Sequence, residues 1–203
     1  MTDPAARATG PDLELDGGPA ELWIVRHGET EWSRLGRHTS HTEVTLTAAG
    51  EEAARALAPR LAGTTFDRVL TSPRQRARRT AELAGFGDAE VVDDLVEWDY
   101  GDYEGRTTPE IRESDPGWTV WSHPCPGGET AAEVAARLDR VLASVQASGG
   151  RVLAFGHGHA SRALAMRWLG QEVSGGRMLK LDPATISVLG HERESPAVAR
   201  WNG

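Results

Sequence analysis

The stretch Leu22-Trp23-Ile24-Val25-Arg26-His27-Gly28 is a short, continuous apolar run that stops at an arginine and a histidine. A run of this length, bounded by polar residues, is typical of a strand buried on both faces inside a parallel sheet. The sequence therefore predicts a buried first strand whose carboxyl end presents Arg26 and His27.

Further strands and helices are predicted downstream of this run. Thr47 is a good N-cap for a helix whose apolar face is formed by Ala54, Leu57, Ala58 and Leu61. Pro59 should bend or shorten that helix, because proline removes one backbone hydrogen bond. A weaker strand over 68–71 leads to Ser72 and Pro73, which favour a helix over 73–84, since serine caps helices and proline fits the first turn. A short strand is predicted at 91–92.

The second half of the chain continues the same alternation. The aromatic and acidic segment 97–105 contains two glycines, which indicates a structured loop. Thr130 and Glu133 form a predicted capping box for a helix over 130–147. A strand over 151–155, a helix over 160–169 and two late, antiparallel strands at 186–189 and 197–199 follow. Strands alternating with helices predict an α/β fold, a three-layer α/β/α sandwich around a mostly parallel central sheet.

Composition limits the classes of protein to which the chain could belong. At 203 residues, it suits a single domain over 21–203, preceded by a flexible tail at 1–20 that lacks the features of a secretory signal. No apolar run approaches the roughly 20 residues that span a bilayer, so we expect no membrane segment. The net charge of −8, without a basic stripe, argues against nucleic acid as a partner.

Cysteine usage bears on the compartment in which the protein works. Cys125 is the only cysteine, so no intramolecular disulfide can form, and we expect a reducing cytoplasm. The sequence leaves the oligomeric state open, with a homodimer as one option.

Chemically active side chains follow three of the predicted strands. They are Arg26 and His27, then Ser72 with Arg76 just inside the next helix, and His157. Ligands of open α/β sheets bind beyond the carboxyl ends of the strands, so these residues should meet in one crevice. Arginine matches the oxygens of a phosphate, and a neutral histidine can carry a phosphoryl group. The pattern indicates phosphoryl transfer.

The ordered motifs of the chain resemble those of the histidine phosphatase, or phosphoglycerate mutase-like, superfamily. They are Arg26-His27-Gly28-Glu29-Thr30, Leu46-Thr47-Ala48-Ala49-Gly50, Ser72-Pro73-Arg74-Gln75-Arg76-Ala77, Glu97 ahead of Tyr100-Gly101-Asp102-Tyr103-Glu104-Gly105, Pro126-Gly127-Gly128-Glu129-Thr130 and Gly156-His157-Gly158. The match covers about Leu22 to Gly170. Within the superfamily, the chain is most similar to the sedoheptulose-bisphosphatase-type and broad acid phosphatase branch. This resemblance implies a small phosphorylated metabolite, a sugar or organic phosphate, as substrate.

The resemblance also implies a role for each matched residue. His27 would attack phosphorus and form a phosphohistidine, while Arg26, Arg76 and His157 surround the phosphate oxygens. Glu97 would protonate the leaving oxygen and later take a proton from water, which predicts a raised pKa of this carboxyl or an acidic pH optimum. No cofactor and no metal are expected. Contacts with the substrate are expected from Ser33, Thr39, Ser40 and His159, where Ser33 replaces a common asparagine and Ser40 a common glycine.

The residues considered alone leave alternatives open. Glu104, Asp99 and Asp102 compete with Glu97 as the acid, and His157 could be a buried, hydrogen-bonded histidine. A phosphoglycerate mutase is disfavoured, because residues 106–127 lack the lysine and the paired arginines that members with that activity generally carry. A non-catalytic phosphate-ligand-binding protein of the same fold is disfavoured, because no core catalytic position is missing. We therefore expect a metal-independent phosphomonoester hydrolase.

Overall fold

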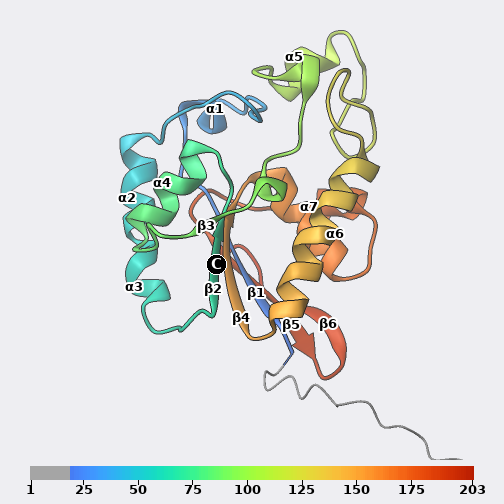
Figure 1. The fold of residues 1–203 in the computed structure, drawn as a ribbon. Helices are drawn as coiled ribbons and strands as arrows, with labels where there is room; N and C mark the ends of the chain where they lie inside the picture. Colours follow the sequence, from blue (N-terminus) through green and yellow to red (C-terminus); the bar gives the residue numbers. More distant parts are fainter. Residues whose placement is uncertain (1–18) are drawn as a thin grey trace, which may run out of the picture.

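The computed structural model describes residues 19–203, so nearly all of the predicted tail at 1–20 lies outside the described residues. The described part forms one six-stranded sheet with helices on both of its faces (Figure 1). The strands are β1 (Glu21–Arg26), β2 (Arg68–Thr71), β3 (Glu90–Val91), β4 (Arg151–Gly156), β5 (Ile186–Glu192) and β6 (Ser195–Arg200). Over this described range, no helix has the length and apolar character needed to cross a membrane.

The order of strands in the sheet is β3-β2-β4-β1-β5-β6. Strands β1 to β4 are mutually parallel, whereas β5 runs antiparallel to β1, and β6 antiparallel to β5. In the register of the central pair, Arg26 at the end of β1 lies opposite Gly156 at the end of β4. The residues after β1 and β4 therefore leave the sheet at the same edge.

Two separate hydrophobic clusters cover the two faces of the sheet. Along β4, Val152 and Ala154 face one cluster, while Leu153 and Phe155 face the other, as the alternation of side chains in a strand requires. Helices α6 (Ala131–Ser148) and α7 (Gly158–Trp168) cover the first face. Helices α3 (Leu57–Leu61) and α4 (Gln75–Leu83) cover the second. The predicted three-layer α/β/α sandwich is confirmed.

The helix predicted after Thr47 is divided in two. The Thr47 hydroxyl caps α2 (Ala48–Arg55) by accepting the N–H of Gly50 at 3.0 Å. The chain bends at Ala56 before α3, because Pro59 has no N–H for the carbonyl four residues earlier. The capping box of α6 is also present, since Thr130 and Glu133 exchange hydrogen bonds.

Two predicted helix boundaries are wrong. Helix α4 begins at Gln75 rather than at Pro73, because the hydroxyl of Ser72 bonds to His157 and Arg74 takes the N-cap position. Helix α7 begins at Gly158, two residues earlier than expected. The short helices α1 (Glu31–Arg34) and α5 (Thr108–Arg112) and the 3₁₀ segments Asp93–Leu95, Gly101–Tyr103 and Val173–Met178 are additional elements.

Candidate active site

Three neighbouring strands bring the candidate residues to one edge of the sheet. Strand β4 lies between β2 and β1, so His157 after β4 is flanked by Ser72 after β2 and His27 after β1. The N–H of His27 continues the sheet pairing with the carbonyl of Gly156 at 2.9 Å. The imidazole rings of His27 and His157 meet edge to face, with centroids 5.3 Å apart. The predicted convergence of strand ends is therefore present.

One hydrogen bond fixes the proton on the ring of His27. Its Nδ1 lies 2.7 Å from the carbonyl oxygen of Gly28, which can only accept, so Nδ1 carries the hydrogen. The lone pair is then on Nε2, and His27 lines the cavity described below. Burial, followed by the charges of Arg76 and Arg26, lowers the pKa of His27 well below its usual value. The ring is therefore neutral around pH 7.

The loop that carries His27 depends on a close approach of two glycines. A β-carbon on Gly28 would lie 2.5 Å from the carbonyl oxygen of Gly50 in α2, and one on Gly50 would lie 2.2 Å from the carbonyl oxygen of Glu29. The N–H of Gly28 also donates to the hydroxyl of Thr80 in α4 at 3.0 Å. Two helices therefore hold the backbone that orients His27.

Three buried nitrogens around His27 have no hydrogen-bond partner among the described residues. They are Nε of Arg26, Nε of Arg76 and Nδ1 of His157. Burying an unpaired polar group costs about 1–3 kcal/mol, and more for a charged one. Burial lowers the pKa of both arginines, and the carboxylate of Glu97 opposes this shift. These donors form a cationic site suited to the oxygens of an anion.

Arg76 also organises the loop that follows α1. Its terminal nitrogens donate to the carbonyls of Thr42, Thr39 and Ser40 at 3.1 to 3.2 Å. From the other side, the carboxylate of Glu104 accepts the N–H groups of Ser40 and Thr42 and the hydroxyl of Ser40. The segment 39–42 is thus held between an arginine and a carboxylate.

The carboxylate of Glu97 lies at the start of α7. Its Oε1 accepts the N–H groups of Trp98 and Ala160 at 2.9 and 2.7 Å, and its Oε2 accepts that of His159 at 3.0 Å. These contacts fix the orientation of the carboxyl group at the N-terminus of the helix. Glu97 is 6% exposed and lines the same cavity as His27. By contrast, the carboxylate of the competing acid Glu104 accepts its hydrogen bonds from the 39–42 loop.

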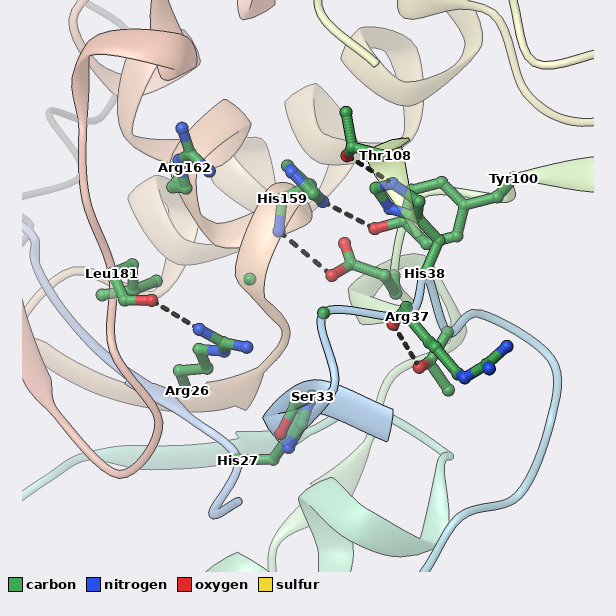
Figure 2. A pocket seen from close by; sticks show the side chains of 14 residues that line it. Arg26, His27, Ser33, Arg37, His38, Tyr100, Thr108, His159, Arg162 and Leu181 are labelled. Atoms are coloured by element: carbon green, nitrogen blue, oxygen red, sulfur yellow. Dashed lines mark hydrogen bonds between the residues drawn. The ribbon is translucent and has the colours of Figure 1, made fainter. Parts of the chain in front are cut away.

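These groups border a cavity of about 270 Å³ (Figure 2). Of the residues predicted for the site, Arg26, His27, Ser33, Thr39, Glu97 and His159 line it. Arg76 and His157 lie deeper, with exposures of 1% and 0%. Ser40 is misplaced in the sequence interpretation, because its side chain is buried against Glu104 and is not part of the lining.

Two of the predicted contact residues use their polar atoms locally. The hydroxyl of Ser33 donates to the carbonyl of Thr30 at 3.1 Å and accepts the N–H of Thr30 at 2.9 Å, which completes the N-cap of α1. The ring of His159 shares a hydrogen bond with the hydroxyl of Tyr100, Nδ1 to oxygen 2.7 Å (Figure 2). Burial, then the charges of His38, Arg162 and Arg26, lowers the pKa of His159 well below its usual value.

The lining contains residues that the sequence did not single out for the site. They are Gly36, Arg37, His38, Tyr100, Thr108, Gly158, Arg162 and Leu181. Figure 2 labels all of them except the two glycines. Arg26 donates to the carbonyl of Leu181 at 2.5 Å, which links the end of β1 to the loop before β5. Arg162 follows His159 by three residues in α7, and this spacing, which puts two side chains on one face of a helix, is a signal that could have placed it near the site.

In the described part of the chain, no group of three or more His, Cys, Asp or Glu residues has an arrangement that could hold a metal ion. The rings of His157 and His159 have different partners. His157 Nε2 lies 2.8 Å from the hydroxyl of Ser72, and His159 bonds to Tyr100. Both rings serve the protein's own hydrogen-bond network.

Comparisons with known proteins agree with this geometry. The family model of the histidine phosphatase superfamily (branch 1) matches residues 22–203. An acid phosphatase of Mycobacterium tuberculosis (strain ATCC 25618 / H37Rv) is 46% identical over 175 residues, which cover 84% of this chain and 86% of the relative. The sedoheptulose 1,7-bisphosphatase of Saccharomyces cerevisiae (strain ATCC 204508 / S288c) is 37% identical over 180 residues, 72% of this chain and 66% of the relative.

A solved structure shares the fold as well as the sequence. The protein of open reading frame Rv3214 from Mycobacterium tuberculosis superimposes with a TM-score of 0.85 at 43% identity, over 90% of this chain and 97% of that one. The region matched by the family model, residues 22–203, contains every residue that lines the cavity. Together with Arg26, Arg76 and the neutral His27, these matches place the chain in the histidine phosphatase superfamily, branch 1, as a phosphatase that hydrolyses the phosphate esters of small metabolites.

Proposed function

We propose that the enzyme works in two steps, through a phosphohistidine formed on Nε2 of His27. The observation that carries this proposal is the hydrogen bond from Nδ1 of His27 to the carbonyl of Gly28, which directs the lone pair to Nε2. A neutral imidazole with its second nitrogen so fixed is a competent nucleophile.

In the first step, Nε2 attacks the phosphorus in line, and the bond from phosphorus to the ester oxygen breaks. The guanidinium groups of Arg26 and Arg76 neutralise the charge of the phosphoryl oxygens, and the ring of His157, whose pKa is lowered well below its usual value by burial, helps to orient them. All three use nitrogens that have no partner among the described residues. Glu97 supplies the proton to the leaving oxygen.

In the second step, the same groups release the phosphate. Water attacks phosphorus while the carboxylate of Glu97 takes its proton, and the phosphorus–nitrogen bond breaks to restore neutral His27. The backbone N–H groups of Trp98, His159 and Ala160 hold the carboxylate of Glu97 in position for both steps.

The substrate that we propose is a small sugar or organic phosphate. A cavity of about 270 Å³ lined by three arginines suits a compact anion, and the net charge of −8 disfavours nucleic acid. The relatives include an acid phosphatase and a bisphosphatase of a sugar. We propose the reducing cytoplasm as its compartment, since Cys125 is the sole cysteine and is buried.

The test is a screen of phosphorylated metabolites for phosphate release, comparing wild type with His27→Ala and with His123→Ala as a matched control away from the site. We expect His27→Ala to lose at least about 10³-fold in kcat/KM, whereas His123→Ala keeps its activity. Brief incubation with a ³²P-labelled substrate and acid-free quenching should trap label on the wild type only. Full activity in His27→Ala would overturn the assignment, and isomerised substrate without free phosphate would favour a mutase.

A further inference from the structure

Arg162 is a cavity-lining arginine with no role in the two steps above. It lies on α7, three residues after His159, and Figure 2 shows it on the far side of Arg26 from His27. Its Nε donates to the carbonyl of Gly176 at 2.9 Å, and its guanidinium stacks on the ring of Trp121 at 4.7 Å. Two neighbours thus fix the plane of this side chain.

The charge of Arg162 is not compensated by an ion pair within the described residues. Its two terminal nitrogens have no hydrogen-bond partner there, and they are not among the enclosed atoms, so they are accessible from the cavity. Arg37, on the opposite side of the cavity, differs, because it donates to the carbonyl of Gly105 and has Glu110 at 4.0 Å. Arg167, later in the same helix, pairs with Asp139 in a fork at 2.8 and 3.0 Å.

A fixed and partly buried arginine without a counter-ion is costly unless a ligand supplies the negative charge. Burial lowers the pKa of Arg162, although the carboxylate of Glu97 opposes this shift. The planar fork of a guanidinium binds carboxylate or phosphate oxygens in pairs. The open end of Arg162 therefore suits an oxyanion inside the cavity.

That oxyanion is distinct from the phosphoryl group being transferred. The transferred group must contact Nε2 of His27, where Arg26 and Arg76 have their unpartnered nitrogens. Arg162 lies beyond Arg26, in the part of the cavity that also contains His159 and Leu181. Only the leaving-group portion of an ester bound at His27 can reach this region.

We propose that Arg162 determines specificity by binding a second anionic group, a phosphate or a carboxylate, on the leaving-group portion of the substrate. This inference rests on the proposed function at His27. It narrows the substrate class to phosphate monoesters that carry two separated negative groups. Trp121 and the carbonyl of Gly176 act as positioning groups that hold the guanidinium ready.

The experiment compares paired substrates that differ by one anionic group. The pairs are fructose 1,6-bisphosphate against fructose 6-phosphate, and 3-phosphoglycerate against glycerol 3-phosphate. Wild type should prefer the doubly anionic member of at least one pair by roughly tenfold or more in kcat/KM, the range for a charge-assisted hydrogen bond. A preference in the first pair identifies a phosphate, and one in the second pair identifies a carboxylate.

The variants separate charge from packing. Arg162→Met keeps an apolar stem against Trp121 and should abolish the preference, mainly by raising KM for the doubly anionic substrate. For the singly anionic substrates, kcat/KM should change less than about threefold. Arg162→Lys keeps the charge and should recover part of the preference. Arg167→Gln removes an arginine from the same helix and should leave the preference intact.

The outcome for this inference is distinct from that for the proposed function. The inference fails if wild type shows no preference in either pair, or if Arg162→Met keeps the preference. It also fails if Arg162→Met slows the hydrolysis of all substrates equally while its melting temperature is unchanged. Hydrolysis of p-nitrophenyl phosphate by wild type, and its loss in His27→Ala, reports on the proposed function alone.

Discussion

The floor and the wall of the cavity are built from different parts of the fold. The floor consists of Arg26, His27, Arg76 and His157, which follow parallel strands or begin the next helix. The wall consists of Arg37, His38, Tyr100, His159 and Arg162, which come from irregular loops and from α7. The sheet places Arg26, His27 and His157 directly, and Arg76 begins the helix that follows β2. The side chains of Arg37, His38 and Arg162 instead bond to residues outside the sheet. The comparison indicates that the phosphoryl chemistry depends on sheet topology and that substrate choice depends on loop packing.

The largest effect that tests this division is expected for Glu97, which lies where floor and wall meet. Glu97→Gln cannot donate a proton to the leaving oxygen, so kcat for alkyl phosphates should fall about 10²- to 10³-fold. The loss should be much smaller for p-nitrophenyl phosphate, because p-nitrophenolate leaves without a proton. Steady-state kinetics on both substrates measure the difference, with the edge-strand variant Glu90→Gln as a control. An equal loss on both substrates would show that Glu97 acts only by supporting α7.

A smaller effect is expected for Glu104, which supports the loop of the wall but does not face the cavity. Although burial opposes it, hydrogen bonding from Ser40 and Thr42 lowers the pKa of Glu104. Glu104→Gln would replace one acceptor oxygen by a donor, and should cost about 1–3 kcal/mol of unfolding free energy. It should also raise KM roughly tenfold and change kcat much less. Urea unfolding measures the loss of stability, and steady-state kinetics measure KM and kcat. A fall in kcat at constant KM would contradict the division of roles between floor and wall.

The smallest effect concerns the dependence of stability on pH through His38 in the wall. Burial lowers the pKa of His38 to about 4, with Glu104 opposing the shift. The unfolded chain binds a proton below about pH 6.5 and the folded chain does not, so this contribution is present above pH 6.5 and is lost as the pH falls towards 4. Between pH 6.5 and 5, His38 should account for about 1.5 kcal/mol of lost stability.

The free energy of unfolding is measured for wild type and His38→Asn at pH 6.5 and pH 5. The difference between the two proteins gives the contribution of His38. The variant should lose less stability than wild type on acidification, although the other buried histidines still contribute. Identical losses in both proteins would mean that His38 is protonated in the folded state.

The floor could be predicted from sequence because simple rules connect it to the strands. Buried apolar runs end at Arg26-His27 and at Gly156-His157, and the carboxyl ends of parallel strands share one edge of a sheet. The wall could not be predicted, because nothing in the local sequence distinguishes Arg162 from the other polar residues of its helix. Arg37 likewise lies between two short elements. Their approach to the cavity depends on tertiary contacts such as those with Trp121 and Gly105.

Ser72 and Ser40 show why local rules fail within the site. Serine before proline favours a helix start, yet the hydroxyl of Ser72 bonds to Nε2 of His157, 85 residues away, and α4 begins later. Ser40 follows Thr39, which lines the cavity, but its hydroxyl bonds to Glu104 and turns the side chain inward. In both cases, the hydroxyl takes part in a long-range hydrogen bond that local sequence rules do not include.

The contact between Gly28 and Gly50 has a consequence for how sequence variation at this site should be interpreted. A β-carbon at either position would overlap the backbone of the other segment. A larger residue at one glycine therefore cannot be compensated by a smaller residue at the other. The two motifs that contain them therefore form one constraint, although 22 residues separate them in the chain. The motif around Gly50 supplies no reacting group, yet a catalogue of substitutions should show it to be as intolerant as the one around His27.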